Sequence, residues 1–501
     1  MSSSLIRRIL HPTRKPKPDS TISISLFTTV SSPPSDHSNP LISDVVSVLT
    51  HHRSKSRWST LRSLHPSGFT PFQFSEITLR LRNNAHLSLR FFLFTRRYSL
   101  CSHDVDSCST LVHILARSRL KTHARELIRL SLRLADDDED KETDRVSRVF
   151  RSLIKSYNRC GSAPFVFDLL VKSCLDSKEI DGAVMVMRKL RSKGINLQIS
   201  TCNALISEAS KRRDASTGYK LYREVFGLDH ETRADEAKKL KPYVNTFNLM
   251  MVSFYREGET EIVEKIWREM EEEGCSPNAY SYNVLMETYC SRGMMMEAEK
   301  IWEEMKLKRL ELDVVAYNTM IGGLCRNLEV TKAMELCKEM RLKKGIECTS
   351  LTYDHLVKGY CKAGDVDSAM VVYKEMKRKS FEAEGLTIEA LVDGLCGGDD
   401  DEGRVVDAAE IVKEAVEFYP SRKCYELLVK RLCEVGKMER ALKIQAEMVG
   451  RGFKPSGETY KAFINGYGSV GDEETSALLA IEMADALKLR GEDDEEEEEL
   501  Q

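Results

Sequence analysis

The stretch YSYNVLMETYC, at Tyr280–Cys290, is followed by VAYNTMIGGLC at Val315–Cys325, which is the same pattern 35 residues later. Asn248, Asn283 and Asn318 occupy the same place in three successive copies. The whole column is Asp168, Asn203, Asn248, Asn283, Asn318, Asp354, Glu389, Glu426 and Lys461, with steps of 35 to 37 residues except for one step of 45. A fixed period of this length indicates stacked supersecondary units.

Each copy contains two apolar stripes of helical period. In the first stripe Tyr282, Leu285 and Met286 are spaced by three or four residues, and the second stripe begins at Ala298. Gly293 lies between the stripes, where one helix ends and the chain turns. A single hairpin of two helices cannot bury both stripes, so neighbouring hairpins have to stack. The sequence therefore predicts an all-α solenoid of helix-turn-helix repeats.

The composition is typical of a folded, soluble protein. Of 501 residues, 42% are apolar and 31% are charged, and no apolar run is long enough to span a membrane. The fourteen cysteines include no CxxC pair, which argues against a metal or disulfide framework. Five of them share one repeat column, Cys290, Cys325, Cys361, Cys396 and Cys433, and we interpret them as packing residues in a reducing compartment.

The two ends of the chain carry opposite charge. Residues 1–35 are rich in Arg and Ser and hold one acid, Asp19, which is typical of an organelle transit peptide. We expect import into the mitochondrion, with the chloroplast as the alternative and an untargeted N-terminus as a further one. Residues 36–163 form a basic region with an acidic loop at Asp136–Asp140, and residues 492–501 form an acidic tail that we expect to be disordered.

The phrase AYNTMIGGLC, its continuation AMELCKEM, the 35-residue pitch and the closing GCSPN and GFKPS resemble the pentatricopeptide repeat family, in its P-type plant organellar form. Tetratricopeptide repeats differ in having a 34-residue pitch and a Trp-Leu-Gly-Tyr signature, which is absent here. The resemblance implies a right-handed α-solenoid superhelix over residues 164–491, and residues 86–119 resemble the family's degenerate leading repeats. The expected units lie near 164–198, 199–243, 244–278, 279–313, 314–349, 350–384, 385–421, 422–456 and 457–491.

The resemblance also implies binding of single-stranded RNA, with about one base read per repeat by two or three side chains. The reader in the first helix would pair with the last residue of its unit. The pairs expected to read bases are Asn248 with Asn278, Asn283 with Asp313, and Asn318 with Thr349. Tyr280, Val315 and Leu351 would stack between bases, and Lys211, Arg256, Arg326 and Lys362 would contact phosphates, although each of these cations is equally well explained as a solvated helix end.

Several units depart from this pattern. Asp168, Asp354, Glu389, Glu426 and Lys461 complete no familiar pair, and a carboxylate would repel a phosphate chain. We therefore expect base reading over about three central units, between Val244 and Glu384. The expected partner is a pyrimidine-containing single-stranded organellar RNA, with protein cofactors or the ribosome as further partners, and we expect a monomer.

Two other classes of function are weighed against RNA reading. One is a helical-repeat scaffold for protein–protein or ribosome assembly with weak RNA contact. The other is an enzyme, which the sequence disfavours because it has no Walker loop, GxSxG or HExxH motif. The family's zinc deaminase signature is also missing, since the last histidine is His355. No catalytic residue, cofactor or metal is therefore expected.

Overall fold

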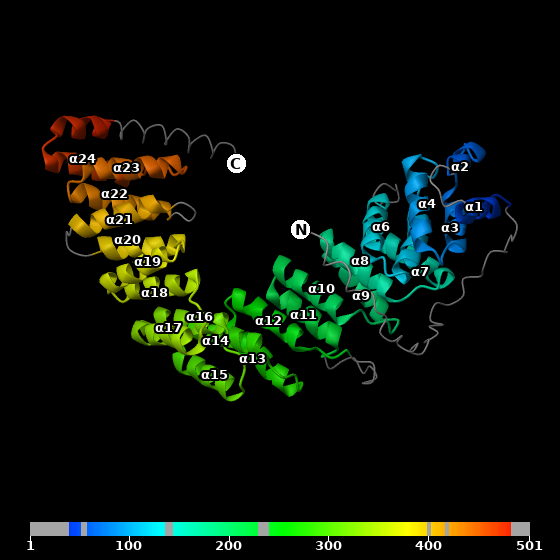
Figure 1. The fold of residues 1–501 in the computed structure, drawn as a ribbon, viewed down its shortest axis with the longest axis horizontal. Coiled ribbons are helices and arrows are strands. Elements are labelled where there is room, and N and C mark those ends of the chain that lie inside the picture. Colours follow the sequence, from blue (N-terminus) through cyan, green and yellow to red (C-terminus); the bar gives the residue numbers. More distant parts are fainter. Residues whose placement is uncertain are drawn as a thin grey trace, which may run out of the picture. The chain divides into compact units, whose positions relative to one another are not determined.

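The computed structural model describes residues 40–51, 58–135, 144–228, 240–397, 402–415 and 420–481. Within these ranges every regular element is an α-helix (Figure 1), which confirms the expected all-α fold. The expected transit peptide, the acidic loop at 136–140 and the acidic tail lie outside the described residues.

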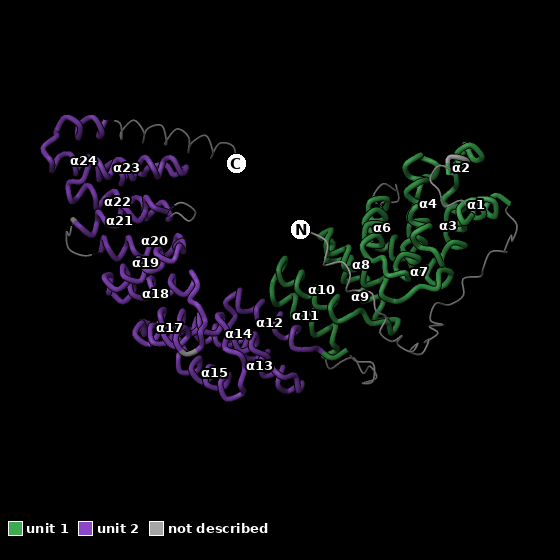
Figure 2. Tube along the Cα trace, viewed as in Figure 1, with its two compact units in different colours: residues 1–241 green, residues 242–501 purple. Residues whose placement is uncertain are grey.

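The chain divides into two compact units, residues 1–241 and residues 242–501 (Figure 2). The first unit holds α1 (Pro40–His51), α2 (Ser59–Leu64), α3 (Pro71–Arg80), α4 (Ala85–Arg97), α5 (Val105–Arg117), α6 (Lys121–Leu134), α7 (Arg145–Cys160), α8 (Phe165–Asp176), α9 (Ile180–Arg191), α10 (Ile199–Arg212) and α11 (Ala215–Phe226). The second unit holds α12 (Val244–Arg256), α13 (Thr260–Glu272), α14 (Ala279–Ser291), α15 (Met295–Leu307), α16 (Val314–Arg326), α17 (Val330–Lys344), α18 (Ser350–Lys362), α19 (Val366–Arg378), α20 (Gly385–Cys396), α21 (Glu402–Glu414), α22 (Arg422–Glu434), α23 (Met438–Gly450) and α24 (Gly457–Val470).

In the second unit the even-numbered helices form one continuous row. Each of α12, α14, α16, α18, α20, α22 and α24 packs against the next even helix, as the succession from green to red in Figure 1 shows. Each odd-numbered helix packs against the even helix before it and the even helix after it. The even helices are the first helices of their hairpins, so the row presents the same helix position once per hairpin.

The first helices approach one another closely because small residues lie between them. A Cβ atom added at Gly323 in α16 would lie 2.3 Å from Sγ of Cys290 in α14. One added at Gly359 in α18 would lie 2.7 Å from Cβ of Cys325 in α16. Cys290 and Cys325 are both buried. The cysteine column therefore serves as the packing surface onto which the next first helix closes.

The second helices seal the core with aromatic and sulfur side chains. Trp267 of α13 and Trp302 of α15 meet Tyr282 and Tyr317 of the following first helix edge to face, with centroids 4.9 and 5.0 Å apart. The methionine column is fully buried at Met270, Met305, Met340, Met376 and Met448, as the helical period predicts.

The turns inside the hairpins use the left-handed backbone region. Gly258, Gly293, Gly364, Gly436 and Gly471 have φ between 72° and 85°. At the same place in the hairpin formed by α16 and α17, the residue is Leu328, with φ 64°. A side chain in this region costs roughly 1–2 kcal/mol relative to glycine. The repeat therefore keeps the turn even where the sequence supplies an unsuitable residue.

In the first unit the alternation of helices is interrupted at α7. This helix packs against α5, α6 and α9, whereas α8 packs against α5, α6, α9 and α10. His113 links α5 to α7, because Nε2–H donates to the Leu153 carbonyl oxygen at 2.9 Å and Nδ1 accepts from the Ser162 hydroxyl at 2.6 Å. Burial lowers the pKa of His113 to about 4. The imidazole is therefore neutral at physiological pH.

Candidate nucleic-acid interface

Three asparagines repeat along the row of first helices. Asn248, Asn283 and Asn318 are each the fifth residue of their helix, in α12, α14 and α16. They are only 5%, 7% and 7% exposed. Because these helices pack consecutively, the asparagines recur once per layer. The expected readers thus occupy equivalent positions in three adjacent layers.

Two of the three asparagines contact the closing residue of their unit. Nδ2 of Asn248 donates to Oδ1 of Asn278 at 3.4 Å, and Nδ2 of Asn318 donates to Oγ1 of Thr349 at 3.2 Å. The Asn318 amide oxygen also accepts from the Thr352 hydroxyl at 2.7 Å. The structure thus brings together two of the pairs that the sequence pattern groups, and it adds Thr352, which the pattern did not indicate.

The third pair is arranged differently. Within the described residues no hydrogen bond joins Asn283 to Asp313, and Oδ1 of Asn283, like that of Asn248, is buried without a partner. A buried amide oxygen of this kind costs about 1–3 kcal/mol. Asp313 is exposed. A rotation about χ2 of Asn283 exchanges oxygen and nitrogen, so this amide can offer either a donor or an acceptor to a ligand.

The closing residues are also helix N-caps. Asn278 and Asp313 accept the backbone N–H groups of Ser281 and Ala316, both at 3.0 Å. Thr349 caps α18 in a reciprocal arrangement with Thr352, whose hydroxyl accepts the Thr349 backbone N–H at 3.0 Å. The expected reading partners are therefore held by the first turn of the next helix, which fixes their direction.

In other layers the position equivalent to these asparagines is an acid, whose carboxylate already accepts hydrogen bonds from the chain itself. Carboxylates of Asp168, Asp354 and Glu389 accept the backbone N–H groups of Gln198, Glu384 and Ser421 at 2.8, 3.2 and 2.6 Å. Each of these amides belongs to the N-cap of the next first helix, and none of the three N-cap side chains forms a cap. The carboxylate thus performs the role that the Thr352 hydroxyl performs at Thr349.

Burial acts on two of these carboxylates. Desolvation raises the pKa of Asp168 and of Asp354, while hydrogen bonds from the next helix oppose the shift. An anion at a helix N-terminus is stabilised by the unpaired amides there. This observation gives a structural reason for acids at positions where the sequence pattern predicted no base reading.

Apolar side chains are exposed at the second position of the same helices. Tyr280, Val315 and Leu351 are 54%, 51% and 41% exposed. Leu386 in α20 continues the column at 65% and was not singled out from the sequence, although it lies three residues before Glu389 as the pattern requires. Four successive first helices thus present a large apolar group to solvent.

The four cations expected to meet phosphates have different surroundings. Arg326 pairs with Glu287 at 2.9 Å, and Glu287 also accepts from the Tyr255 hydroxyl at 3.0 Å. Burial, reinforced by Glu287, raises the pKa of Tyr255 to about 12. Lys362 donates to the Arg326 carbonyl oxygen at 2.7 Å. Arg326 is therefore partly neutralised by an acid that the sequence pattern did not connect with it.

The other two cations are freer. Lys211 at the end of α10 lies 3.9 Å from Glu208 and is 58% exposed, so that ion pair is weak. Arg256, the last residue of α12, is exposed and forms no ion pair within the described ranges. Arg256 is thus the cation of this group best placed to meet an anion.

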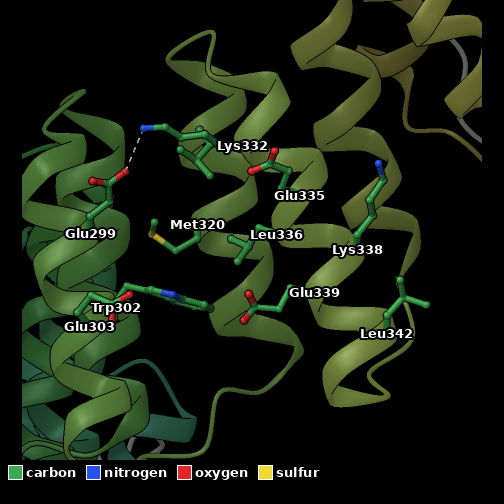
Figure 3. Close-up of a pocket in the computed structure, with 11 residues that line it drawn as sticks. Glu299, Trp302, Glu303, Met320, Lys332, Glu335, Leu336, Lys338, Glu339 and Leu342 are labelled. Atoms are coloured by element: carbon green, nitrogen blue, oxygen red, sulfur yellow. Dashed lines mark hydrogen bonds and ion pairs between the residues drawn. The ribbon is translucent and has the colours of Figure 1, made fainter.

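A groove lies between the second helices α15 and α17. It has a volume of about 620 Å³, with Met320 and Leu324 of α16 among its lining residues. Figure 3 shows Glu299, Trp302 and Glu303 on one side, and Lys332, Glu335, Leu336, Lys338, Glu339 and Leu342 on the other. The lining includes four glutamates, Glu299, Glu303, Glu335 and Glu339, and two lysines, Lys332 and Lys338. Its charge therefore disfavours a polyanion.

Two absences concern only the part of the chain that the structure describes. No group of three or more His, Cys, Asp or Glu side chains there is placed to hold a metal ion. No helix there is long and apolar enough to cross a membrane.

The helical hairpins and their repeated side chains define a class, the α-helical repeat proteins. Models of the PPR repeat family match residues 242–288, 279–326, 312–362 and 348–397, and a PPR repeat model matches residues 424–453. A pentatricopeptide repeat-containing protein of Arabidopsis thaliana is 77% identical over 99% of this chain and 100% of its own length. The chain therefore belongs to the pentatricopeptide repeat family.

More distant relatives agree with this assignment. Another Arabidopsis thaliana pentatricopeptide repeat-containing protein, described as mitochondrial, is 26% identical over 44% of this chain and 32% of its own length. The crystal structure of the maize pentatricopeptide repeat protein PPR10 is 15% identical, covering 89% of this chain and 78% of that one, with a TM-score of 0.35. Because this TM-score is low, the family assignment depends on the sequence relatives and not on the structural match.

Proposed function

We propose that this chain is a sequence-selective single-stranded RNA-binding protein of an organelle, which acts in the stabilisation, processing, splicing or translation of a transcript. One observation carries the proposal. Asn248, Asn283 and Asn318 recur at one position of three consecutive first helices, and two of them touch the closing residue of their own unit. Such a row offers one polar pair per layer to a strand of bases.

The chemistry of the pairs suggests the bases. An asparagine amide has both donors and an acceptor, and a carboxylate has acceptors only. Asn283 with Asp313 resembles the family's pairing for uracil, and Asn248 with Asn278 resembles its pyrimidine pairing. Asn318 with Thr349 is a weaker match, and its amide oxygen is already bound by Thr352. We therefore assign the strongest preference to the layer of Asn283.

The exposed apolar column supplies the second element of an RNA site. Tyr280, Val315 and Leu351, continued by Leu386, project from the turn before each reader position. Stacking of a base on an aromatic side chain is worth about 1–3 kcal/mol and does not depend on base identity. We propose that these side chains separate successive bases, so that each polar pair meets a single base edge.

The proposed site ends where the acids begin. Asp354 and Glu389 bind the N-cap amides of α20 and α22, so their carboxylates are occupied and present negative charge. On the other side Asp168 is occupied in the same way. We propose that the bases are read by the three layers of Asn248, Asn283 and Asn318, within residues 244–384, with phosphate contacts from Arg256, Arg326 and Lys362 and from Lys211 in the preceding hairpin. We assign no catalytic step to the chain.

The proposal is tested by measuring affinity for a uracil-containing oligonucleotide and for a scrambled competitor. Asn283→Ala should weaken binding of the first more than of the second, whereas Arg256→Ala should weaken both about equally, since a phosphate contact carries no sequence information. Equal losses for both oligonucleotides with Asn283→Ala would remove base reading from this layer.

Asp313→Asn provides a matched variant for the same layer. Asparagine retains the oxygen that accepts the Ala316 backbone N–H, so the cap of α16 is preserved. We expect the stability to change little and the preference for uracil to relax toward either pyrimidine. If affinity for both oligonucleotides is unchanged, Asp313 acts only as a cap.

We propose the mitochondrion as the location, with the chloroplast as the alternative. The Arg-rich, acid-poor residues 1–35 support import, and relatives described as mitochondrial support the choice between the two organelles. Import of the full chain into isolated mitochondria and chloroplasts distinguishes the two. Crosslinking in the importing organelle, followed by sequencing of the attached RNA, would then identify the transcript.

A second candidate function, a scaffold for another protein or for a ribosomal subunit, is favoured by the groove between α15 and α17. Its apolar lining and its excess of glutamates suit a basic, amphipathic segment of a partner. A salt series separates the two functions. An RNA reader binds a pyrimidine-rich oligonucleotide and loses affinity as salt rises, whereas a scaffold of this kind shows no binding even at low salt.

A further inference from the structure

Two cysteines that are eleven residues apart in the sequence meet inside the second unit. Cys337 lies in the middle of α17, and Cys348 lies in the short segment between Gly345 and α18. Their sulfur atoms are 3.2 Å apart, and both side chains are buried. A disulfide requires an S–S distance of about 2.05 Å, so the sulfurs have to approach by about 1 Å.

The local backbone allows this approach. The segment after α17 is not helical, and it begins with Gly345 in the left-handed region at φ 65°, where no atom lies within 4 Å of the position of an added Cβ. Cys337 is held in a helix, so the movement falls on Cys348. The two sulfurs already face each other, which leaves only this small displacement for bond formation.

We propose that Cys337 and Cys348 form a redox-active thiol pair, which hydrogen peroxide converts into an intramolecular disulfide and which small thiols reduce again. The inference goes beyond the proposed RNA binding and does not depend on it. It assigns a modification site to two cysteines that lie outside the repeat column of packing cysteines.

The electrostatics of the pair favour Cys348 as the attacking sulfur. The hydrogen bond shared with Cys337, together with the nearby Lys379 and Arg341, lowers the pKa of Cys348 to about 7, against the opposing effects of burial and Glu347. The same shared hydrogen bond raises the pKa of Cys337. By contrast, burial raises the pKa of Cys290 and Cys325 to about 12. The thiolate is the reactive form, so Cys348 should react first.

The reaction balances in two steps. The Cys348 thiolate attacks one oxygen of hydrogen peroxide, the O–O bond breaks, and sulfenic acid and hydroxide are formed. The Cys337 sulfur then attacks the Cys348 sulfur, and the displaced hydroxyl group leaves as water with the proton of the Cys337 thiol. The hydroxide from the first step takes up the proton that Cys348 released when it ionised. Two thiols lose two electrons and peroxide gains them, giving one disulfide and two waters. Two equivalents of a small thiol reverse the change.

The new bond would fix the start of α18. Cys348 directly precedes Thr349, the N-cap of α18, whose hydroxyl accepts from Asn318 at 3.2 Å. A disulfide would close a loop from Cys337 to Cys348. It would lower the conformational entropy of this segment when the segment unfolds locally. Amide exchange at Thr349, Ser350 and Leu351 should therefore slow on oxidation.

The test treats the full chain with hydrogen peroxide and maps the peptides with and without reduction. We expect a linked peptide joining Cys337 to Cys348, a mass loss of two hydrogens and full reversal by dithiothreitol. Formation should be at least about tenfold faster than modification of Cys290 or Cys325, given their higher pKa values. A map without the linked peptide, or with modification spread evenly over the cysteines, overturns the proposal.

Two single variants assign the order of events. In Cys337→Ser the sulfenic acid at Cys348 should persist and be trapped by dimedone, whereas in Cys348→Ser residue Cys337 should remain a thiol. Cys325→Ser, which removes a thiol from α16, is the control and should leave disulfide formation unchanged. If Cys337 oxidises equally fast in Cys348→Ser, the proposed order is wrong. Should either variant fail to fold, the map of the unmodified chain decides.

Discussion

At the scale of single residues, His113 shows how a buried titratable group makes stability depend on pH. Its ring joins α5 to α7 through Leu153 and Ser162, and burial keeps it neutral by lowering its pKa to about 4. In the unfolded chain the same group titrates near 6.5. Between these pH values the unfolded state binds one proton more than the folded state does. The stabilisation that neutral His113 provides is therefore complete above pH 6.5 and is lost as the pH falls toward 4.

This dependence predicts the effect of mild acid on the first unit. Lowering the pH from 7 to 5 should reduce the free energy of unfolding by about 2 kcal/mol through His113 alone, at about 1.36 kcal/mol per pH unit below 6.5. Urea unfolding of the full chain, followed by exchange at amides of α5 and α7, measures the loss. His113→Gln should show a shallower pH dependence, and an unchanged slope in that variant contradicts the assignment.

Asp354 provides the opposite case. Burial raises the pKa of this carboxyl, so the folded state holds its proton more tightly than the unfolded state does. Its stabilising contribution is therefore greatest below the unfolded value of 3.8 and is lost as the pH rises through the folded pKa.

Asp354→Asn tests both the charge and the cap. Asparagine keeps an oxygen for the Glu384 backbone N–H and removes the buried charge. We expect the variant to unfold at a higher temperature than the parent chain at pH 7, and the difference to vanish below about pH 4. Asp354→Ala should instead destabilise by about 1–3 kcal/mol, because the amide loses its acceptor. Thermal unfolding monitored by circular dichroism at several pH values measures all three chains.

At the scale of elements, the hairpin of α16 and α17 contains a correctable weakness. Leu328 occupies the left-handed turn position that Gly258 and Gly293 occupy in their own hairpins, and its side chain is 54% exposed. Leu328→Gly should therefore raise the free energy of unfolding by about 1 kcal/mol, since backbone strain is relieved and little packing is lost. Urea denaturation measures the change.

Gly258→Ala is the matched control for that change. Its φ is 79° and no atom lies within 4 Å of the position of an added Cβ, so any effect comes from the backbone alone. We expect this variant to lose about 1 kcal/mol. If both substitutions move stability in the same direction, the turn geometry is not what determines it.

The elements also show how far sequence reasoning extends. The hairpins, the buried methionine column and the packing cysteines follow from periodicity, because one helical face repeats every 35 residues. The link between Glu287 and Arg326, and the meeting of Cys337 and Cys348, depend on how particular side chains and one linker are directed in three dimensions. Periodicity carries no information about these directions. The occupied carboxylate of Asp354 could be recognised as a departure from the pattern, but its capping role could not.

At the scale of the whole molecule, the balance of charges determines how strongly affinity depends on salt. The chain has 75 basic and 78 acidic residues, and the proposed phosphate contacts number only four, Lys211, Arg256, Arg326 and Lys362. Each phosphate contact to a single strand contributes about 0.7 to the slope of log affinity against log salt. We expect a slope between about −2 and −3 in a titration with a pyrimidine-rich oligonucleotide. A much steeper slope would mean that arginines and lysines of the basic region, residues 36–163, also bind phosphates.

The N-cap position of Thr349 limits how repeats of this kind can be rewritten. The residue that closes one unit starts the next helix, so exchanging it to recode a base also changes the neighbour's folding. Asn278, Asp313 and Thr349 are N-caps as well as the proposed reading partners, whereas at Gln198 and Glu384 the N-cap amide is bound by an acid in the preceding layer. The final residue of a transplanted repeat must therefore come from the few residue types that are good N-caps. This requirement reduces the number of residue types that an artificial array can use at that position.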